Sequence, residues 1–267
     1  RESICPLCSR GCNIYIDSHP GHPRTLSARR VYRIRARANP DVNSHWICDY
    51  GRYDYAYLDE GRLDKLVWKK GGRETRLSWD KAAQILTEKI RSLVLRGKNS
   101  RIGVVLHTNL TNEELFLADR IFRKGLGVER LFLADPPPGK GDEFLLTADR
   151  TANRRGFEEL GLSAQAADPK ALSGLDLLLV FGHYLASAGS QADLKYALGK
   201  IETKALFSSH KSGLDELFDF IIPVPVIAEK SGSLTNIDGR VQTFVAGLDF
   251  GGEGLPEWSA LLDLAKE

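Results

Sequence analysis

The residues of this chain with the clearest chemical potential are its four cysteines. Cys5, Cys8 and Cys12 follow one another at short spacings, and Cys48 stands well downstream of them. Three thiolates from one loop and a fourth brought in by folding can ligate a [4Fe–4S] cluster, and Gly11 lets the backbone pass close to it. The spacing therefore predicts a [4Fe–4S] cluster held by all four cysteines, and a role in electron transfer.

Two other uses of the cysteines stay open. Zinc also binds four thiolates, but structural zinc sites usually combine two closely spaced pairs, whereas here the fourth cysteine stands alone. Disulfides are the third interpretation. Cys5 and Cys8 are too close in sequence to close a stabilising loop, and no signal peptide indicates an oxidising compartment. The cluster is therefore favoured over both.

The composition is that of a globular protein large enough to bury a full core. Hydrophobic residues make up 42% of the 267 positions, which suits one large or two modest domains. The longest apolar run, Leu175 to Phe181, is interrupted by Asp176 and is too short to span a membrane, so no direct membrane insertion is expected. The net charge of +2 gives no general electrostatic basis for binding nucleic acid.

One local concentration of charge is an exception. The segment from Arg24 to Arg37 contains several arginines and no acidic residue. These side chains could form the solvated face of a hairpin, compensate a negatively charged cluster or meet an acidic partner, and we favour compensation of the cluster. The chain also begins with Arg1 and contains no methionine, which predicts that it is part of a longer polypeptide.

Residues 1–70 are predicted to form a small β-rich module around the cluster. Asn13–Asp17 and Val31–Arg35 alternate between apolar and polar side chains, and the segment between them contains proline and glycine. This pattern predicts a β-hairpin that leads away from the first three cysteines and returns toward the fourth. Lys69–Arg73 then has the composition of a linker to a second domain, residues 71–267.

The second domain alternates short apolar strands with amphipathic helices. Ser78 caps a predicted helix that runs to about Leu95, and Thr111 with Glu114 forms a capping box that opens a helix ending near Gly125. Further strands are predicted at Ile102–Leu106, Arg130–Ala134, Leu175–Phe181, Lys204–Ser208 and Phe220–Val224, and further helices at Ala192–Ile201 and Asp215–Leu217. This alternation predicts an α/β fold whose parallel sheet is covered on both faces, a Rossmann-like layer sandwich.

Nucleotide-binding motifs are missing from this domain. The segment after Leu106 lacks the glycine-rich dinucleotide fingerprint, and Pro136–Gly141 lacks the Ser or Thr that completes a Walker phosphate loop. We interpret Pro136–Gly141 as a stiff surface loop. Ser231–Gln242 contains turn glycines and polar residues that bond loop backbone, so it is predicted to be a surface loop that satisfies its own hydrogen bonds.

The histidines are weaker candidates. His107 and His183 follow strands, where ligand-binding residues of α/β sheets often lie, but a lone histidine there is more often a structural loop residue. His19, His22 and His45 lie in the cysteine-bearing half and could replace a thiolate as ligands. With four cysteines present, none of these three is required.

The cysteine motif and several later stretches resemble a known family. Cys5-x2-Cys8-x3-Cys12, followed by Val42-Asn43-x2-Trp46-x-Cys48-Asp49-x-Gly51-Arg52 and Arg62-Leu63, resembles the iron–sulfur module that opens the molybdopterin oxidoreductase fold. Ser78–Asp80, Thr111–Glu114 and Ala228–Gln242 are similar to it as well, so the resemblance covers nearly the whole chain. Within that superfamily, the pattern resembles the large iron–sulfur subunit of bacterial NADH-quinone oxidoreductase, complex I.

Departures from the catalytic members of the family bear on function. Such members are expected to carry a lysine directly after the fourth cysteine, where this chain has Asp49-Tyr50, and a further metal ligand, for which no cysteine is left over. The chain also lacks the large inserted domain and the C-terminal barrel that enclose a bis-pterin cofactor. The resemblance therefore implies a non-catalytic redox subunit that holds one [4Fe–4S] cluster at the four cysteines and has no molybdopterin chemistry of its own.

The resemblance also implies partners and a location. The partners would be the other subunits of a membrane-associated NADH-quinone oxidoreductase, and the location would be cytoplasmic, on the inner face of the cell membrane and attached through those subunits. Two further hypotheses stay open: an assembly module whose site holds zinc or a cluster off the electron path, and a fragment of a molybdopterin enzyme such as a formate dehydrogenase. Assays for iron with sulfide, for zinc, and for molybdenum with pterin distinguish the three.

Overall fold

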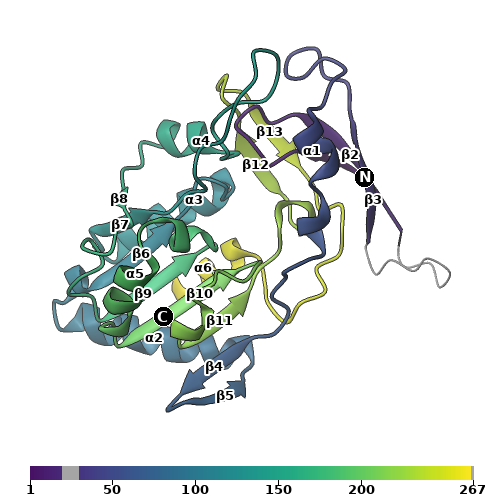
Figure 1. The fold of residues 1–267 in the computed structure, drawn as a ribbon. Helices are drawn as coiled ribbons and strands as arrows, with labels where there is room; N and C mark the ends of the chain where they lie inside the picture. Colours follow the sequence, from purple (N-terminus) through teal and green to yellow (C-terminus); the bar gives the residue numbers. More distant parts are fainter. Residues whose placement is uncertain (20–29, 266–267) are drawn as a thin grey trace.

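The computed structural model describes residues 1–19 and 30–265 of the chain. Figure 1 shows a large sheet with helices around it in the lower part of the view, and a smaller β-rich region with the N-terminus above it. The segment that connects the predicted hairpin, with His22, Arg24 and Arg29, lies outside the described residues. Within the described residues, no helix is long and apolar enough to cross a membrane.

The large sheet has eight strands in the order β5-β4-β11-β10-β9-β6-β7-β8. The strands from β11 to β8 are parallel to their neighbours, whereas β4 is antiparallel to β11 and β5 is antiparallel to β4. Their bounds are β4 Val67–Lys70, β5 Arg73–Arg76, β6 Ile102–Leu106, β7 Arg130–Leu133, β8 Gln165–Ala166, β9 Leu177–Phe181, β10 Thr203–Ser208 and β11 Phe220–Pro223. The predicted parallel sheet is confirmed, with small shifts at the strand ends.

Two helices begin at the predicted caps. The Lys81 N–H donates to Ser78 Oγ at the start of α2 (Trp79–Leu95), and the capping box of Thr111 and Glu114 opens α3 (Asn112–Ala118). The predicted second helix does end near Gly125, but its last part, Asp119–Gly125, is π-helical. The other helices are α4 Arg154–Glu159, α5 Gln191–Gly199 and α6 Glu257–Ala265, and Asp215–Leu217 is a short 3₁₀ helix.

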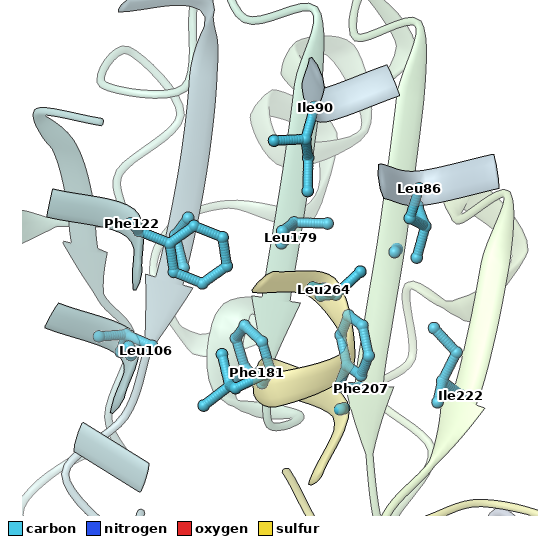
Figure 2. Packing of buried hydrophobic residues seen from close by; sticks show 14 of the residues in the cluster. Leu86, Ile90, Leu106, Phe122, Leu179, Phe181, Phe207, Ile222 and Leu264 are labelled. Atoms are coloured by element: carbon cyan, nitrogen blue, oxygen red, sulfur yellow. The ribbon is translucent and has the colours of Figure 1, made fainter. Parts of the chain in front are cut away.

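Both faces of the central strands of the large sheet are buried, as predicted. On one face, residues of β6, β9, β10 and β11 pack against α2, α3, the π-helical segment and α6 (Figure 2). Phe181 and Phe207 stack at the centre of this face with ring centroids 4.7 Å apart, and each fully buried side chain of this size contributes roughly 1.5–3 kcal/mol. The opposite face packs against α5 through Leu194, Ala197 and Leu198.

The small region contains two separate antiparallel pairings. β1 (Glu2–Ile4), β2 (Asn13–Ser18) and β3 (Val31–Ala36) form a three-stranded sheet, which confirms the predicted hairpin. Near them lies a two-stranded ribbon of β12 (Gly232–Thr235) and β13 (Val241–Phe244). The prediction that Ser231–Gln242 is a surface loop satisfying its own hydrogen bonds is therefore wrong, because half of it is strand and several of its polar side chains are buried.

The predicted linker is a hairpin of the large sheet. Gly71 and Gly72 join β4 to β5, and both have positive φ angles, 57° and 76°. A tight hairpin turn with two such residues strongly favours glycine. Because β4 already pairs with β11, the chain enters the large sheet before residue 71. The division into residues 1–70 and 71–267 stays a prediction.

Candidate functional site

The three clustered cysteines lie in the loop between two strands of the small sheet. Cys5 directly follows β1 and Cys12 directly precedes β2, and the Cys5 N–H donates to the Cys12 carbonyl oxygen at 2.8 Å. Because β1 and β2 are antiparallel neighbours, they hold the two ends of this cysteine loop together. Gly11 within the loop has a φ angle of 66°, which glycine adopts without steric cost.

Cys48 reaches the same site from another segment. It caps the short helix α1 (Asp49–Tyr53), and the Gly51 N–H donates to its Sγ at 3.3 Å. A Cβ atom on Gly51 would lie 3.2 Å from Cys5 Sγ. The first turn of α1 therefore packs directly against the cysteine loop, and Gly51 contacts thiols from both segments.

All four cysteines are free thiols that influence one another electrostatically. Cys5, Cys8 and Cys12 are only 4–5% exposed, whereas Cys48 is half-buried. Burial first, and then repulsion from neighbouring cysteines, raises the pKa of Cys5 well above its ordinary value and that of Cys12 to about 12. Without a cation, Cys5 and Cys12 thus favour the protonated form. A metal centre would displace these protons and hold the sulfurs as thiolates.

The four cysteine side chains are ligands of the kind that an iron–sulfur cluster takes. Their thiols are largely shielded from water, and the N–H groups of Gly51 and Leu7 bond to Cys48 and Cys5 respectively. Such N–H donors to sulfur are among the features that set the reduction potential of a cluster. In residues 1–19 and 30–265, no three His, Cys, Asp or Glu side chains form a group that could hold a metal ion. The cysteines are therefore candidate ligands, not an observed metal centre.

Among the described residues, neither His19 nor His45 forms a metal-holding group with the cysteines. His45 is exposed on the segment before Cys48, and His19 lies beside the ring of Tyr32, with centroids 6.4 Å apart. The third, His22, is outside the described residues. The described histidines thus offer no observation in favour of a role as alternative ligands.

The β12–β13 ribbon holds the cysteine loop in place. Gln242 Nε2 donates to the Gly11 carbonyl oxygen at 2.9 Å, and the Ile237 N–H donates to the Ser9 carbonyl oxygen at 2.8 Å. Gln242 Oε1 also accepts a hydrogen bond from Asn13 Nδ2 at 2.5 Å. A Cβ on Gly11 would lie 2.8 Å from Gln242 Nε2, so only glycine fits here. The sequence indicated only a local role for Ser231–Gln242. The contacts with the cysteine loop were not predictable, because they join residues far apart in the chain.

Asn43 positions the segment that carries Cys48. Its Oδ1 accepts a hydrogen bond from the Asn13 N–H at 3.0 Å, and its Nδ2 donates to the carbonyl oxygens of Trp46 at 2.8 Å and Arg37 at 3.2 Å. Asn13 directly follows Cys12, so one buried amide connects the segments of two candidate ligands. The resemblance motif included Asn43, but nothing in the sequence indicated this role.

The segment that contains Pro136–Gly141 continues over the cysteines. Residues 137–141 are exposed, as expected for a surface loop. Further along, the Asp149 carbonyl oxygen accepts a hydrogen bond from the Ser9 N–H at 3.1 Å, and Leu145 is buried in the apolar cluster that includes Cys5. This segment, residues 136–150, is called the covering loop below.

Arginines of the expected compensating segment pair with carboxylates instead. Arg33 and Arg35 both bind Asp17, with N···O distances of 2.6 and 2.8 Å, and Arg30 binds Asp59 and Glu229, both at 2.7 Å. Among the described residues, these pairings stabilise the small sheet and its attachment to the rest of the molecule. This differs from the expected role of compensating a cluster.

A cavity of about 330 Å³ lies between the cysteine loop and the carboxyl ends of the parallel strands. Its wall includes Leu7, His107 after β6, His183 after β9 and His210 after β10. Ligands of open α/β sheets bind at this edge. The structure thus brings the two predicted strand-end histidines together. His210 was not predicted as a site residue, although it follows a predicted strand in the same way.

These three histidines are uncharged at neutral pH. Burial is the main cause that lowers the pKa of each, to about 4 for His183 and well below the ordinary value for His107. His210 Nε2 lies 2.7 Å from the carbonyl oxygen of Tyr57, and His107 Nδ1 accepts the Asn109 N–H at 3.2 Å. Within residues 1–19 and 30–265, the buried Nδ1 of His183 has no hydrogen-bond partner. The rings of His107 and His210 are therefore held in place as parts of the cavity wall.

A buried ionic group lies beside this cavity. Lys230 Nζ donates to both carboxylate oxygens of Glu114, at 2.9 and 2.8 Å, and to Glu257 Oε2 at 3.0 Å. The group joins the start of the ribbon to α3 and α6. Burial, followed by repulsion from Glu114, raises the pKa of Glu257 to about 8, although Lys230 acts in the opposite direction. Glu257 is thus largely protonated at pH 7.

The raised pKa of Glu257 predicts a pH dependence of stability. Between its ordinary pKa of 4.5 and about 8, the folded state binds more protons than the unfolded state, so the free energy of unfolding falls as the pH rises. Glu257→Gln should flatten this decline, by up to on the order of 1 kcal/mol per pH unit. Urea unfolding at several pH values measures it. The exposed Glu88→Gln is the control, and an unchanged slope in Glu257→Gln would contradict the assignment.

Comparison with known proteins identifies relatives of one kind. No protein-family model matches the chain. It is 33% identical over 119 residues to NADH-quinone oxidoreductase subunit 3 of Thermus thermophilus, and 33% identical over 126 residues to an NADH-quinone oxidoreductase subunit of Streptomyces coelicolor. It is 29% identical over 155 residues to the 75 kDa subunit of NADH-ubiquinone oxidoreductase of Reclinomonas americana. These matches confirm the resemblance to the large iron–sulfur subunit of complex I.

The matched regions are partial. They cover 45%, 46% and 55% of this chain, but only 14%, 13% and 21% of the Thermus, Streptomyces and Reclinomonas proteins. Among solved structures, acetylene hydratase from Pelobacter acetylenicus aligns with a TM-score of 0.63. The alignment covers 99% of this chain and 68% of that chain at 11% identity, so it concerns the fold alone.

Proposed function

We propose that this chain is the electron-transfer part of a protein like the large iron–sulfur subunit of NADH-quinone oxidoreductases, and that its four cysteines hold one [4Fe–4S] cluster. The observation that carries this proposal is the convergence of shielded free thiols from two distant segments at one end of the small sheet. Similarity to named subunits of NADH-quinone oxidoreductases supports the assignment to such a complex.

The residues around the cysteines have defined tasks in this proposal. A bound cluster would supply one-electron redox chemistry. Leu145 and Ile47 pack beside Cys5 and keep water away, and the N–H groups of Gly51 and Leu7 lower the energy of the thiolate form at Cys48 and Cys5. The ribbon and the covering loop fix the cysteine loop from two other sides.

We propose no molybdopterin catalysis for this chain. All four of its cysteines are assigned to the cluster, so no thiol is left to ligate molybdenum, and Asp49-Tyr50 occupies the position where the resemblance leads one to expect a catalytic lysine. The proposed partners are the other subunits of the oxidoreductase. The proposed location is the cytoplasmic face of the cell membrane, to which those subunits would attach it.

Metal analysis of anaerobically purified protein tests the proposal. We expect about four irons and four acid-labile sulfides per chain, with the broad visible absorption of an iron–sulfur cluster. One zinc per chain without sulfide would instead favour the assembly module. Stoichiometric molybdenum and pterin would favour a fragment of a catalytic enzyme. A protein free of iron after cofactor assembly in the host would overturn the redox assignment.

A further inference from the structure

A second hollow opens at the surface beside the fourth cysteine. It has a volume of about 370 Å³ and is lined on one side by Cys48 and its neighbours, and on the other by the covering loop. Cys48 is the least buried of the four thiols. This space, called the Cys48 hollow below, is therefore where the candidate cluster site comes nearest to solvent.

Aromatic side chains stand exposed at the Cys48 hollow. Trp46 is 57% exposed and Phe144 is 66% exposed, and their rings meet edge to face with centroids 5.7 Å apart. Tyr50 also lines the hollow, and Tyr53 is exposed on the next turn of α1. Large apolar side chains gathered on a surface mark an interaction site, and tryptophan, tyrosine and phenylalanine are enriched at the centres of protein interfaces.

The charges at the hollow are negative. Asp49 and Asp142 are the charged residues that line it. The N–H groups of residues 144–146, Leu145 foremost, bond to Asp142 and lower its pKa, which keeps this carboxylate ionised. The nearby guanidinium of Arg150 lies over the Tyr50 ring, 4.9 Å from its centroid, and donates to backbone carbonyl oxygens. A cluster with four thiolate ligands would add further negative charge.

We propose that the Cys48 hollow docks the basic face of a one-electron carrier protein, and that electrons pass between this carrier and the cluster at Cys48. The inference rests on the proposed function. Charge complementarity selects the carrier: positive groups around its redox centre would face Asp49 and Asp142, while Trp46 and Phe144 would pack at the middle of the contact. In each exchange, the reduced cluster loses one electron and the carrier gains it, and no bond or proton is transferred.

Stopped-flow kinetics on the full chain test this proposal. Protein shown by iron content and visible spectrum to hold its cluster is reduced, and then mixed with a c-type cytochrome whose haem edge is ringed by lysines. The matched control is the same cytochrome after succinylation of those lysines. At low salt, we expect electron transfer to the native cytochrome to be about tenfold faster or more, and this advantage should shrink as salt is added.

Variants locate the contact. Phe144→Ser and Trp46→Ser should each slow electron transfer about tenfold, and Asp49→Asn should weaken the salt dependence. Tyr196→Ser changes an equally exposed aromatic residue on α5 and should leave the rate unaltered. Equal rates in all variants, or equal rates with both cytochromes, would overturn the docking proposal alone. A colourless protein without iron would overturn the proposed function and this inference with it.

Discussion

Replacing Cys48 with serine is expected to remove the proposed cluster and to loosen the first part of the chain. Iron should fall from about four per chain toward none, because the cysteine loop supplies only three of the four ligands. Metal binding and local folding are coupled, and α1 packs against the cysteine loop through Gly51, so order should be lost up to about Leu66. Iron analysis, visible absorption and hydrogen exchange measure these effects.

The large sheet should stay folded in this variant. Its two core clusters contain none of the cysteines, so hydrogen exchange in β6 and β9 should be unchanged. His45→Ala is the matched control, because His45 is exposed on the same segment and should be dispensable for iron binding. If Cys48→Ser kept its full iron content, the assignment of Cys48 as a ligand would be wrong.

The large sheet could be predicted because its signals are local. β6 and β9 are continuous apolar runs, and the caps at Ser78 and Thr111 indicate helices within a few residues of the chain. The β4–β5 hairpin was missed for the opposite reason. Every residue of β5 is exposed and polar, so its sequence has no apolar alternation, and only its pairing with β4 makes it a strand.

The site was predictable only in part. The spacing of the four cysteines predicted a ligand set, which stays a prediction, and the structure places all four thiols at one end of the small sheet. Their supports could not be inferred, because Gln242 and Asn43 act through hydrogen bonds to residues far away in sequence. In a sequence, polar side chains of this kind are typical of loops, because the backbone groups that they bind come close only when the chain folds.

A second large effect is expected from Glu229→Ala. The Glu229 side chain is 1% exposed, and its two oxygens bind Arg30 at 2.7 Å and Arg62 at 2.6 Å. Arg30 also binds Asp59, and Arg62 donates to the Ser209 carbonyl oxygen just after β10, so the carboxylate links the small region to the large sheet. Removing the Glu229 carboxylate leaves the mostly buried Arg62 guanidinium without this negatively charged partner. The free energy of unfolding should fall by about 3 kcal/mol.

The control for this variant is Glu74→Ala on the exposed strand β5. Glu74 pairs with Lys69 at 3.3 Å, but its side chain faces water, so its removal should cost less than about 1 kcal/mol. Urea unfolding compares the two variants, and limited proteolysis locates the change. Because Glu229 lies at the junction between the small region and the large sheet, its loss should expose new cleavage sites between β3 and β4. Equal stabilities of both variants would show that the junction is held by apolar packing instead.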